Sequence, residues 1–201
     1  MTRRDDLLEG PKDRAIAAIK SGEKEEAIQH VEELYQEFKP LHDRYAEWIQ
    51  CLLCFIADKL GEEAVEEALR KTYTDVYKDI LPSHLNRSPE ELIKWCCRTH
   101  RLHYSECYVE EDDEKYTLFI TYCGSGSKIQ EKYKSYGRSK KAAPWTANQK
   151  GLCYYCAHEP VFKMAAREIG RDTVDWEAHS QFDEDGKPTG QPCKWVAYKE
   201  R

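Results

Sequence analysis

The stretch CYVEEDDEKYTLFITYCGSG, from Cys107 to Gly126, decides the fold. Polar and apolar side chains alternate on both sides of the acidic run at residues 110–114, which predicts two antiparallel strands joined by a turn. The glycine-rich segment at residues 123–126 then breaks the second strand. We therefore expect a β-hairpin that is followed at once by a tight turn.

Two further strand patterns and one helix follow the hairpin. Alternation at residues 173–179 and 193–198 predicts two strands, and the apolar spacing of residues 160–169 predicts a helix that Gly170 ends. Residues 127–150 are polar and rich in lysine, so we expect a long loop, with room for one helical turn, that acts as a lid.

The residues before the hairpin have a helical pattern. Ser88, Pro89 and Glu91 supply an N-cap, a first-position proline and a capping-box glutamate, which predicts a helix that runs to about Tyr104. Between residues 12 and 82, apolar side chains recur every three or four positions and predict four helical segments. The first is expected to end at Ser21-Gly22, the second to stop near Pro40 and the last to reach Ile80.

These elements together predict an α+β fold: a helical N-terminal half packed on a small antiparallel sheet with one or two helices. The helical region is expected to span residues 1–87 and the α+β region to span residues 88–201, with both in one compact unit. Five Trp and 13 Tyr residues can build its core, because large aromatic side chains offset the low content of aliphatic residues.

Charge and hydropathy exclude several classes of function. The chain has 31 Lys and Arg against 37 Asp and Glu, a net charge of −6, which argues against a general nucleic-acid binder. It has no apolar run near the ~20 residues of a membrane helix, and its first residues lack the hydrophobic segment of a signal peptide. We therefore expect a soluble, cytoplasmic protein.

Nine cysteines are the main chemical anomaly, and their odd number rules out full disulfide pairing within one chain. Cys153 and Cys156 form a Cys-x-x-Cys pair that could bind zinc together with two further ligands. Cys123 and Cys193 are the candidates for these, with His158 and His179 in competition, and an iron–sulfur cluster is the other metal centre considered. Buried apolar thiols and a redox pair remain the alternatives.

The turn at residues 123–126 is a second candidate site. Cys123 could act as a nucleophile there while Gly124, Ser125 and Gly126 direct backbone N–H groups at developing negative charge. The simpler interpretation is a turn that only ends a strand. Tyr155, Trp176 and Trp195, together with Trp145, are expected to wall the substrate pocket.

Three histidines are candidates for proton transfer: His42, His100 and His158. His100 shares a helix face with Cys96 and His103, and His42 opens the most apolar helix, from which it could face a pocket. Dipole complementation and an ordinary capping role are the respective alternatives for these two residues.

Two short motifs carry a family resemblance. Gly61-Glu62-Glu63-Ala64 after a long helix, and the ending Gly190-Gln191-Pro192-Cys193-Lys194-Trp195, resemble the L-2-amino-thiazoline-4-carboxylate hydrolase-like proteins, which are related in outline to vinyl-4-reductase (V4R) sensor domains. The first group implies hydrolytic opening of a small ring that contains nitrogen and sulfur, with Cys193 in the place of the family's late cysteine. The sensor relatives imply a cysteine-ligated zinc beside an aromatic ligand pocket, for which Cys153 and Cys156 would have to serve.

The leading hypothesis is a cytoplasmic enzyme that hydrolyses a small polar molecule, containing nitrogen or sulfur, with the help of a cysteine thiol or a cysteine-ligated metal. A non-catalytic zinc, iron–sulfur, redox or ligand-sensing module is the alternative. A third class is a partner-binding protein that uses its helical half, and the sequence leaves homo-oligomer formation open.

Overall fold

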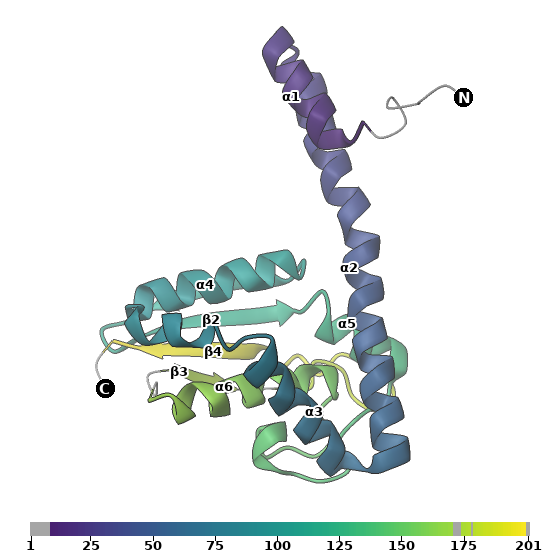
Figure 1. Ribbon diagram of the computed structural model, residues 1–201, viewed down its shortest axis with the longest axis vertical. Coiled ribbons are helices and arrows are strands. Elements are labelled where there is room, and N and C mark those ends of the chain that lie inside the picture. The colour runs from purple at the N-terminus through teal and green to yellow at the C-terminus, as the bar shows by residue number, and fades with distance from the viewer. Residues whose placement is uncertain (1–8, 171–173, 178, 200–201) are drawn as a thin grey trace. The chain divides into compact units, whose positions relative to one another are not determined.

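The computed structural model describes residues 9–170, 174–177 and 179–199, without the side chains of His84, Leu85, Val174 and Trp176 (Figure 1). The chain divides into two compact units, residues 1–45 and residues 46–201. The second unit holds helices and an antiparallel sheet, so the predicted α+β class is confirmed. None of the described helices is long and apolar enough to cross a membrane.

The first unit is a helical hairpin. Helix α1 (Pro11–Ser21) ends as predicted at Gly22, whose φ of 80° forms the left-handed C-terminal cap and lets its N–H reach the carbonyl of Ile19. The chain then enters helix α2 (Lys24–Leu60). Ala15, Ala18 and Ala27 are buried, so this hairpin has a core of small side chains.

The prediction that a helix ends near Pro40 is wrong, because helix α2 continues through this residue. It runs 37 residues without interruption and contains Pro40 in its interior. Proline cannot donate the backbone hydrogen bond to residue 36 and costs a helix about 3 kcal/mol. The flanking residues are good helix formers, which offsets this cost, and the Arg44 side chain donates to the Pro40 carbonyl at 3.1 Å.

The next helices lead into the sheet. Helix α3 (Glu62–Asp75) ends five residues before the predicted Ile80, and a short 3-10 segment, η2 (Leu81–Asn86), follows. Helix α4 (Pro89–Leu102) starts with the predicted capping box: Ser88 Oγ accepts from the Glu91 N–H at 3.2 Å, and Glu91 Oε2 accepts from the Ser88 N–H at 2.8 Å.

Among the described residues the sheet has four antiparallel strands in the order β1-β2-β4-β3. They are β1 (Glu106–Glu111), β2 (Lys115–Tyr122), β3 (Val174–Glu177) and β4 (Cys193–Tyr198). In the predicted hairpin turn, Asp112 Oδ1 accepts from the backbone N–H groups of Glu114 and Lys115, both at 2.9 Å.

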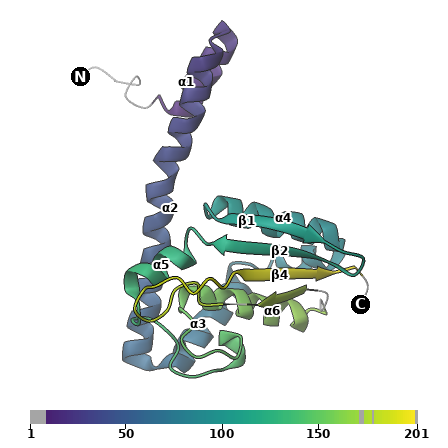
Figure 2. The same cartoon turned by 180° about the vertical axis from the view of Figure 1, so that it is seen from behind.

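Helices cover one face of this sheet. Figures 1 and 2, seen from opposite sides, show α4 and α6 (His158–Glu168) on the same face. Leu118 and Ile120 of β2 point to that face and are 0% exposed, and Trp195 of β4 lies opposite Leu118. Burial of each such side chain contributes about 1.5–3 kcal/mol, so this layer contains the main core.

The structure of residues 127–150 differs from the predicted loop and lid. The segment contains helix α5 (Gly126–Tyr133) and the 3-10 turn η3 (Pro144–Thr146), and Ile129 and Trp145 are buried. The Arg138 guanidinium is also buried and donates to the carbonyls of Gly151, Phe182 and Asp183 at 2.8 to 3.1 Å. A segment fixed by such bonds is part of the core of the second unit.

Candidate functional site: a cysteine–histidine pair beside an aromatic pocket

Cys123 lies immediately after β2, in the turn that begins helix α5. Its backbone N–H donates to Ser127 Oγ at 2.8 Å and to Gln181 Oε1 at 3.1 Å, and its carbonyl accepts from the Ser127 N–H at 3.0 Å. The Gly126 N–H donates to Cys123 Sγ at 3.2 Å. The turn is therefore fixed, and it directs a backbone donor at the sulfur atom.

His100, in the last turn of α4, lies near enough to this sulfur to change the pKa of the thiol. Burial alone would raise the pKa of the Cys123 thiol, but the hydrogen bond and charge of His100, with the backbone N–H groups of Gly126 and Ser125, lower this pKa to about 7. His100 is 6% exposed, and its Nδ1 atom has no hydrogen-bond partner in the described part of the chain. The sequence named both residues separately, and the structure brings them together.

The two glycines of the turn permit this close approach. A Cβ atom at Gly124 would lie 2.0 Å from the His103 carbonyl oxygen, and a Cβ at Gly126 would lie 2.7 Å from Cys156 Sγ and 3.6 Å from Cys123 Sγ. Neither glycine has the positive φ that a glycine-rich turn suggests. Their contribution is the missing side chain, which lets the end of α4 and the cysteine sulfurs pack against the turn.

A half-buried ion pair lies near the thiol. His158 Nε2 is 3.0 Å from Glu159 Oε1, and the His158 Nδ1–H group donates to the Tyr155 carbonyl. Burial by itself would lower the pKa of His158, but the Glu159 carboxylate and, to a smaller extent, Cys123 raise it to about 9. Burial would raise the pKa of Glu159, whereas His158, followed by His100 and His103, lowers it. The site thus holds an imidazolium at neutral pH.

An aromatic pocket opens beside these groups. It has a volume of about 250 Å³, and its lining includes His100, His103, His158 and Glu159. Its apolar walls are five aromatic side chains: Tyr73, Tyr77, Trp95, Phe162 and Trp195. A second pocket of about 430 Å³ shares Tyr73, Tyr77, His103 and His158 with the first, and Ile49, Leu52 and Ile56 of α2 form part of its wall.

The cysteines predicted as metal ligands lie near the turn, but each thiol has another partner. Gln130 Nε2 donates to Cys156 Sγ at 3.4 Å, Cys153 Sγ donates to Gln50 Oε1 at 3.3 Å, and Cys193 Sγ donates to the His179 carbonyl at 3.2 Å. In the described ranges, no three His, Cys, Asp or Glu side chains are arranged to hold a metal ion. We therefore derive no step through a metal, and the zinc and iron–sulfur sites stay predictions.

The remaining predicted site residues are distributed as follows. Ser125 Oγ lies 2.7 Å from His103 Nδ1, and Trp195 lines the first pocket. Tyr155 lines the second pocket, where its ring meets His158 edge-on at 5.2 Å between centroids. Trp176 is on β3 opposite Trp195, and its side chain is outside the described part.

His42 belongs to the first unit. Its Nδ1 atom is 3.1 Å from Asp43 Oδ1, and its ring is 6.5 Å from that of Phe38. The residues described above for the Cys123 site belong to the second unit, and the proton-transfer role of His42 stays a prediction.

Sequence reasoning missed Glu159, Tyr73 and Tyr77 as parts of the site, and it named His103 only as a neighbour of His100 on the helix face. Tyr73 donates its hydroxyl to the His158 carbonyl at 2.7 Å and so fixes the start of α6. The adjacent pair His158 and Glu159 was visible in the sequence, but its burial depends on how α3 and α4 pack around α6.

Comparison of the chain with protein-family models, with curated proteins and with solved structures finds no match. The function is therefore argued from the site alone.

Proposed function

We propose that this protein is a cysteine-dependent hydrolase of a small polar molecule, with Cys123 as the nucleophile and His100 as the proton acceptor. The observation that carries the proposal is a Cys123 thiol that accepts a hydrogen bond from the Gly126 N–H and whose pKa the nearby His100 lowers, beside a pocket lined by aromatic rings and by His100. A thiolate is the reactive form of cysteine, and a neighbouring imidazole with backbone N–H donors favours it near neutral pH.

The reaction would proceed through a covalent intermediate. The Cys123 sulfur attacks an electrophilic C=O or C=N carbon, and the negative charge that develops on the oxygen or nitrogen lies near the His158 imidazolium. His100, which has taken the thiol proton, gives it to the leaving group. Water then attacks the thioester or its nitrogen analogue, loses a proton to His100 and releases the Cys123 thiolate.

The pocket suggests the substrate class. About 250 Å³ accommodates a molecule of a few heavy atoms, and ring faces from Trp95, Phe162 and Trp195 favour a flat or partly apolar body. The half-buried His158–Glu159 pair and the buried His100 Nδ1, which has no hydrogen-bond partner among the described residues, favour polar groups at one end. A small heterocycle or amide that contains nitrogen or sulfur fits this description.

The test is to trap the covalent intermediate. We expect small activated esters and thioesters to give a burst of about one released alcohol or thiol per chain, with the acyl mass on the peptide that contains Cys123. Replacement of Cys123 by Ser should abolish the burst and lower turnover by roughly a thousandfold. The matched control is Cys193→Ser, which removes a neighbouring half-buried thiol and should keep the burst.

Acylation at another cysteine, or turnover that persists undiminished in the Cys123→Ser variant, would contradict the proposal. Saturable binding of such compounds without any acylation would instead favour a ligand-sensing module that uses the same pocket.

A further inference from the structure

Helix α2 carries a seven-residue repeat whose large apolar side chains are mostly half-exposed in the described part of the chain. The spacing alternates between three and four along the whole series: Ile28, Val31, Tyr35, Phe38, His42, Tyr45, Ile49, Leu52 and Ile56. Such a series places one row of side chains along a single face over four heptads, which is the pattern of a helix that packs lengthwise on other helices. We refer to these nine residues as the α2 seam.

Most of the α2 seam is exposed. Seven of its members, Ile28, Val31, Tyr35, Phe38, Tyr45, Ile49 and Leu52, are each between 47% and 55% exposed. A parallel row of four large side chains widens the stripe, with exposures from 41% to 61%: Leu34, Leu41, Trp48 and Phe55. A soluble chain rarely leaves a continuous apolar stripe of this size open to water.

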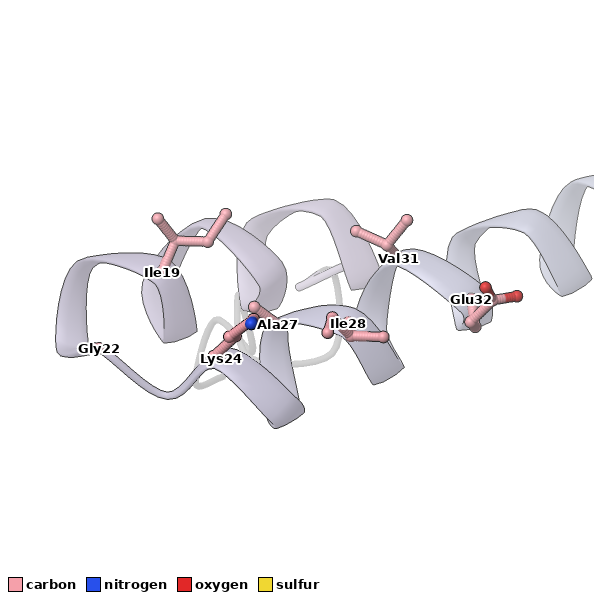
Figure 3. A pocket seen from close by; sticks show the side chains of 7 residues that line it. All are labelled: Ile19, Gly22, Lys24, Ala27, Ile28, Val31 and Glu32. Atoms are coloured by element: carbon pink, nitrogen blue, oxygen red, sulfur yellow. The ribbon is translucent and has the colours of Figure 1, made fainter.

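The hairpin of α1 and α2 shows why the α2 seam needs a further packing layer. Figure 3 shows Ile19 of α1 and Ile28 and Val31 of α2, which line an open pocket of about 400 Å³ in the first unit. The contacts between α1 and α2 use the small residues Ala15, Ala18 and Ala27, while the larger side chains remain exposed. A two-helix hairpin with so small a core needs a further layer for stability.

The occupant must match the α2 seam in length. Apart from α2, the described helices have 8 to 14 residues and span at most about two heptads. The helix in this chain that carries the same repeat over the same length is α2 itself. A repeat of a and d positions packs best on another copy of that repeat.

We propose that the α2 seam is the interface between two copies of this chain, whose α2 helices pack along each other to form a helical bundle. Seven half-exposed side chains of roughly 100 Å² each offer on the order of 700 Å² per copy, close to the ~800 Å² per partner of a stable interface.

The interface would also complete the pocket region. Ile49, Leu52 and Ile56 belong both to the α2 seam and to the wall of the 430 Å³ pocket that contains His103 and His158. A second α2 helix on this face would cover that wall and restrict access to the pocket. The dimer proposal itself does not depend on the proposed hydrolase activity.

The experiment is a mass measurement in solution on the full chain, by analytical ultracentrifugation over a wide range of concentrations. We expect the wild-type protein to have twice the chain mass of 23.6 kDa. The double variant Val31→Glu/Phe38→Glu should have the single-chain mass, because it buries two carboxylates in the interface but leaves the half-exposed positions of the monomer accessible to water.

Gln36→Glu is the matched control, since it adds a charge at an exposed position of the same helix outside the α2 seam and should preserve the double mass. Far-UV circular dichroism of all three proteins checks that the helices persist. A wild-type protein at 23.6 kDa up to the highest concentration would overturn the proposal. So would a folded double variant that keeps the wild-type mass, whereas a mass halved only in that variant supports it.

Discussion

At the scale of single residues, the Cys123–His100 pair is the centre of the proposed chemistry and gives a direct pH test. The pKa of the Cys123 thiol is lowered from 9.0 to about 7, so alkylation by iodoacetamide should reach half of its maximal rate near pH 7. In the variant His100→Gln the midpoint should move toward 9, because the imidazole contribution is lost while the backbone N–H groups remain.

The corresponding change at pH 7 is a fall of roughly tenfold in the alkylation rate of Cys123. Peptide mass mapping over the pH series measures this rate for each cysteine. Cys51 is exposed on α2 and serves as the internal comparison, whose profile should be the same in both proteins. An unchanged Cys123 midpoint in His100→Gln would show that the imidazole does not act on this thiol.

The sequence identified these two residues but could not relate them. Cys123 drew attention as a thiol in a glycine-rich turn and His100 as a histidine on a helix face, and nothing in their spacing indicates contact. Their contact depends on Gly124, which lets the His103 carbonyl approach the turn more closely than any side chain would allow. Close approach of backbone segments is a tertiary property that local patterns do not encode.

At the scale of elements, local signals predicted the caps and the strands best. The Ser88 capping box, the Gly22 cap and strand β4 lie where the sequence places them, because each depends on contacts within a few residues. Helix α5 and the end near Pro40 were predicted wrongly. The Lys-rich segment folds because Arg138 and Trp145 are buried by distant parts of the chain.

A substitution at Pro40 tests the local stability of helix α2. Replacement by Ala should restore the backbone N–H that donates to residue 36 and stabilise α2 locally by up to about 3 kcal/mol. Amide hydrogen exchange at residues 36–44 measures this stability, and protection should increase there without change in strands β2 and β4. Faster exchange in Pro40→Ala would mean that the proline contributes to the packing of α2 and does not merely interrupt its hydrogen bonds.

At the scale of the whole molecule, the charges of the site link folding to pH in two opposite ways. The pKa of His158 is raised from 6.5 to about 9, so its stabilisation is complete below pH 6.5 and is lost as pH rises through 9. The pKa of Cys123 is lowered from 9.0 to about 7, so its stabilisation is present above pH 9 and is lost as pH falls through 7. Between pH 7 and 9 the two effects partly cancel in the wild-type protein.

Removal of the Cys123 thiol should therefore leave the pH dependence contributed by His158 without its compensating effect. We expect the free energy of unfolding of Cys123→Ser to fall between pH 7 and 9 relative to the wild-type profile. The His158 side chain is 34% exposed, and solvent screening limits the difference to about 1–2 kcal/mol. Urea unfolding followed by tryptophan fluorescence measures it in the second unit, because all five Trp residues lie after residue 45.

Cys193→Ser is the control for the loss of a thiol, since burial raises the pKa of Cys193 to about 12 and keeps this group neutral throughout the range. Its profile should run parallel to that of the wild-type protein. A Cys123→Ser profile that also stays parallel would mean that the thiolate and the imidazolium do not share the site at neutral pH. The charge separation on which the hydrolase proposal depends would then be absent from the folded protein, whatever the alkylation rate of Cys123.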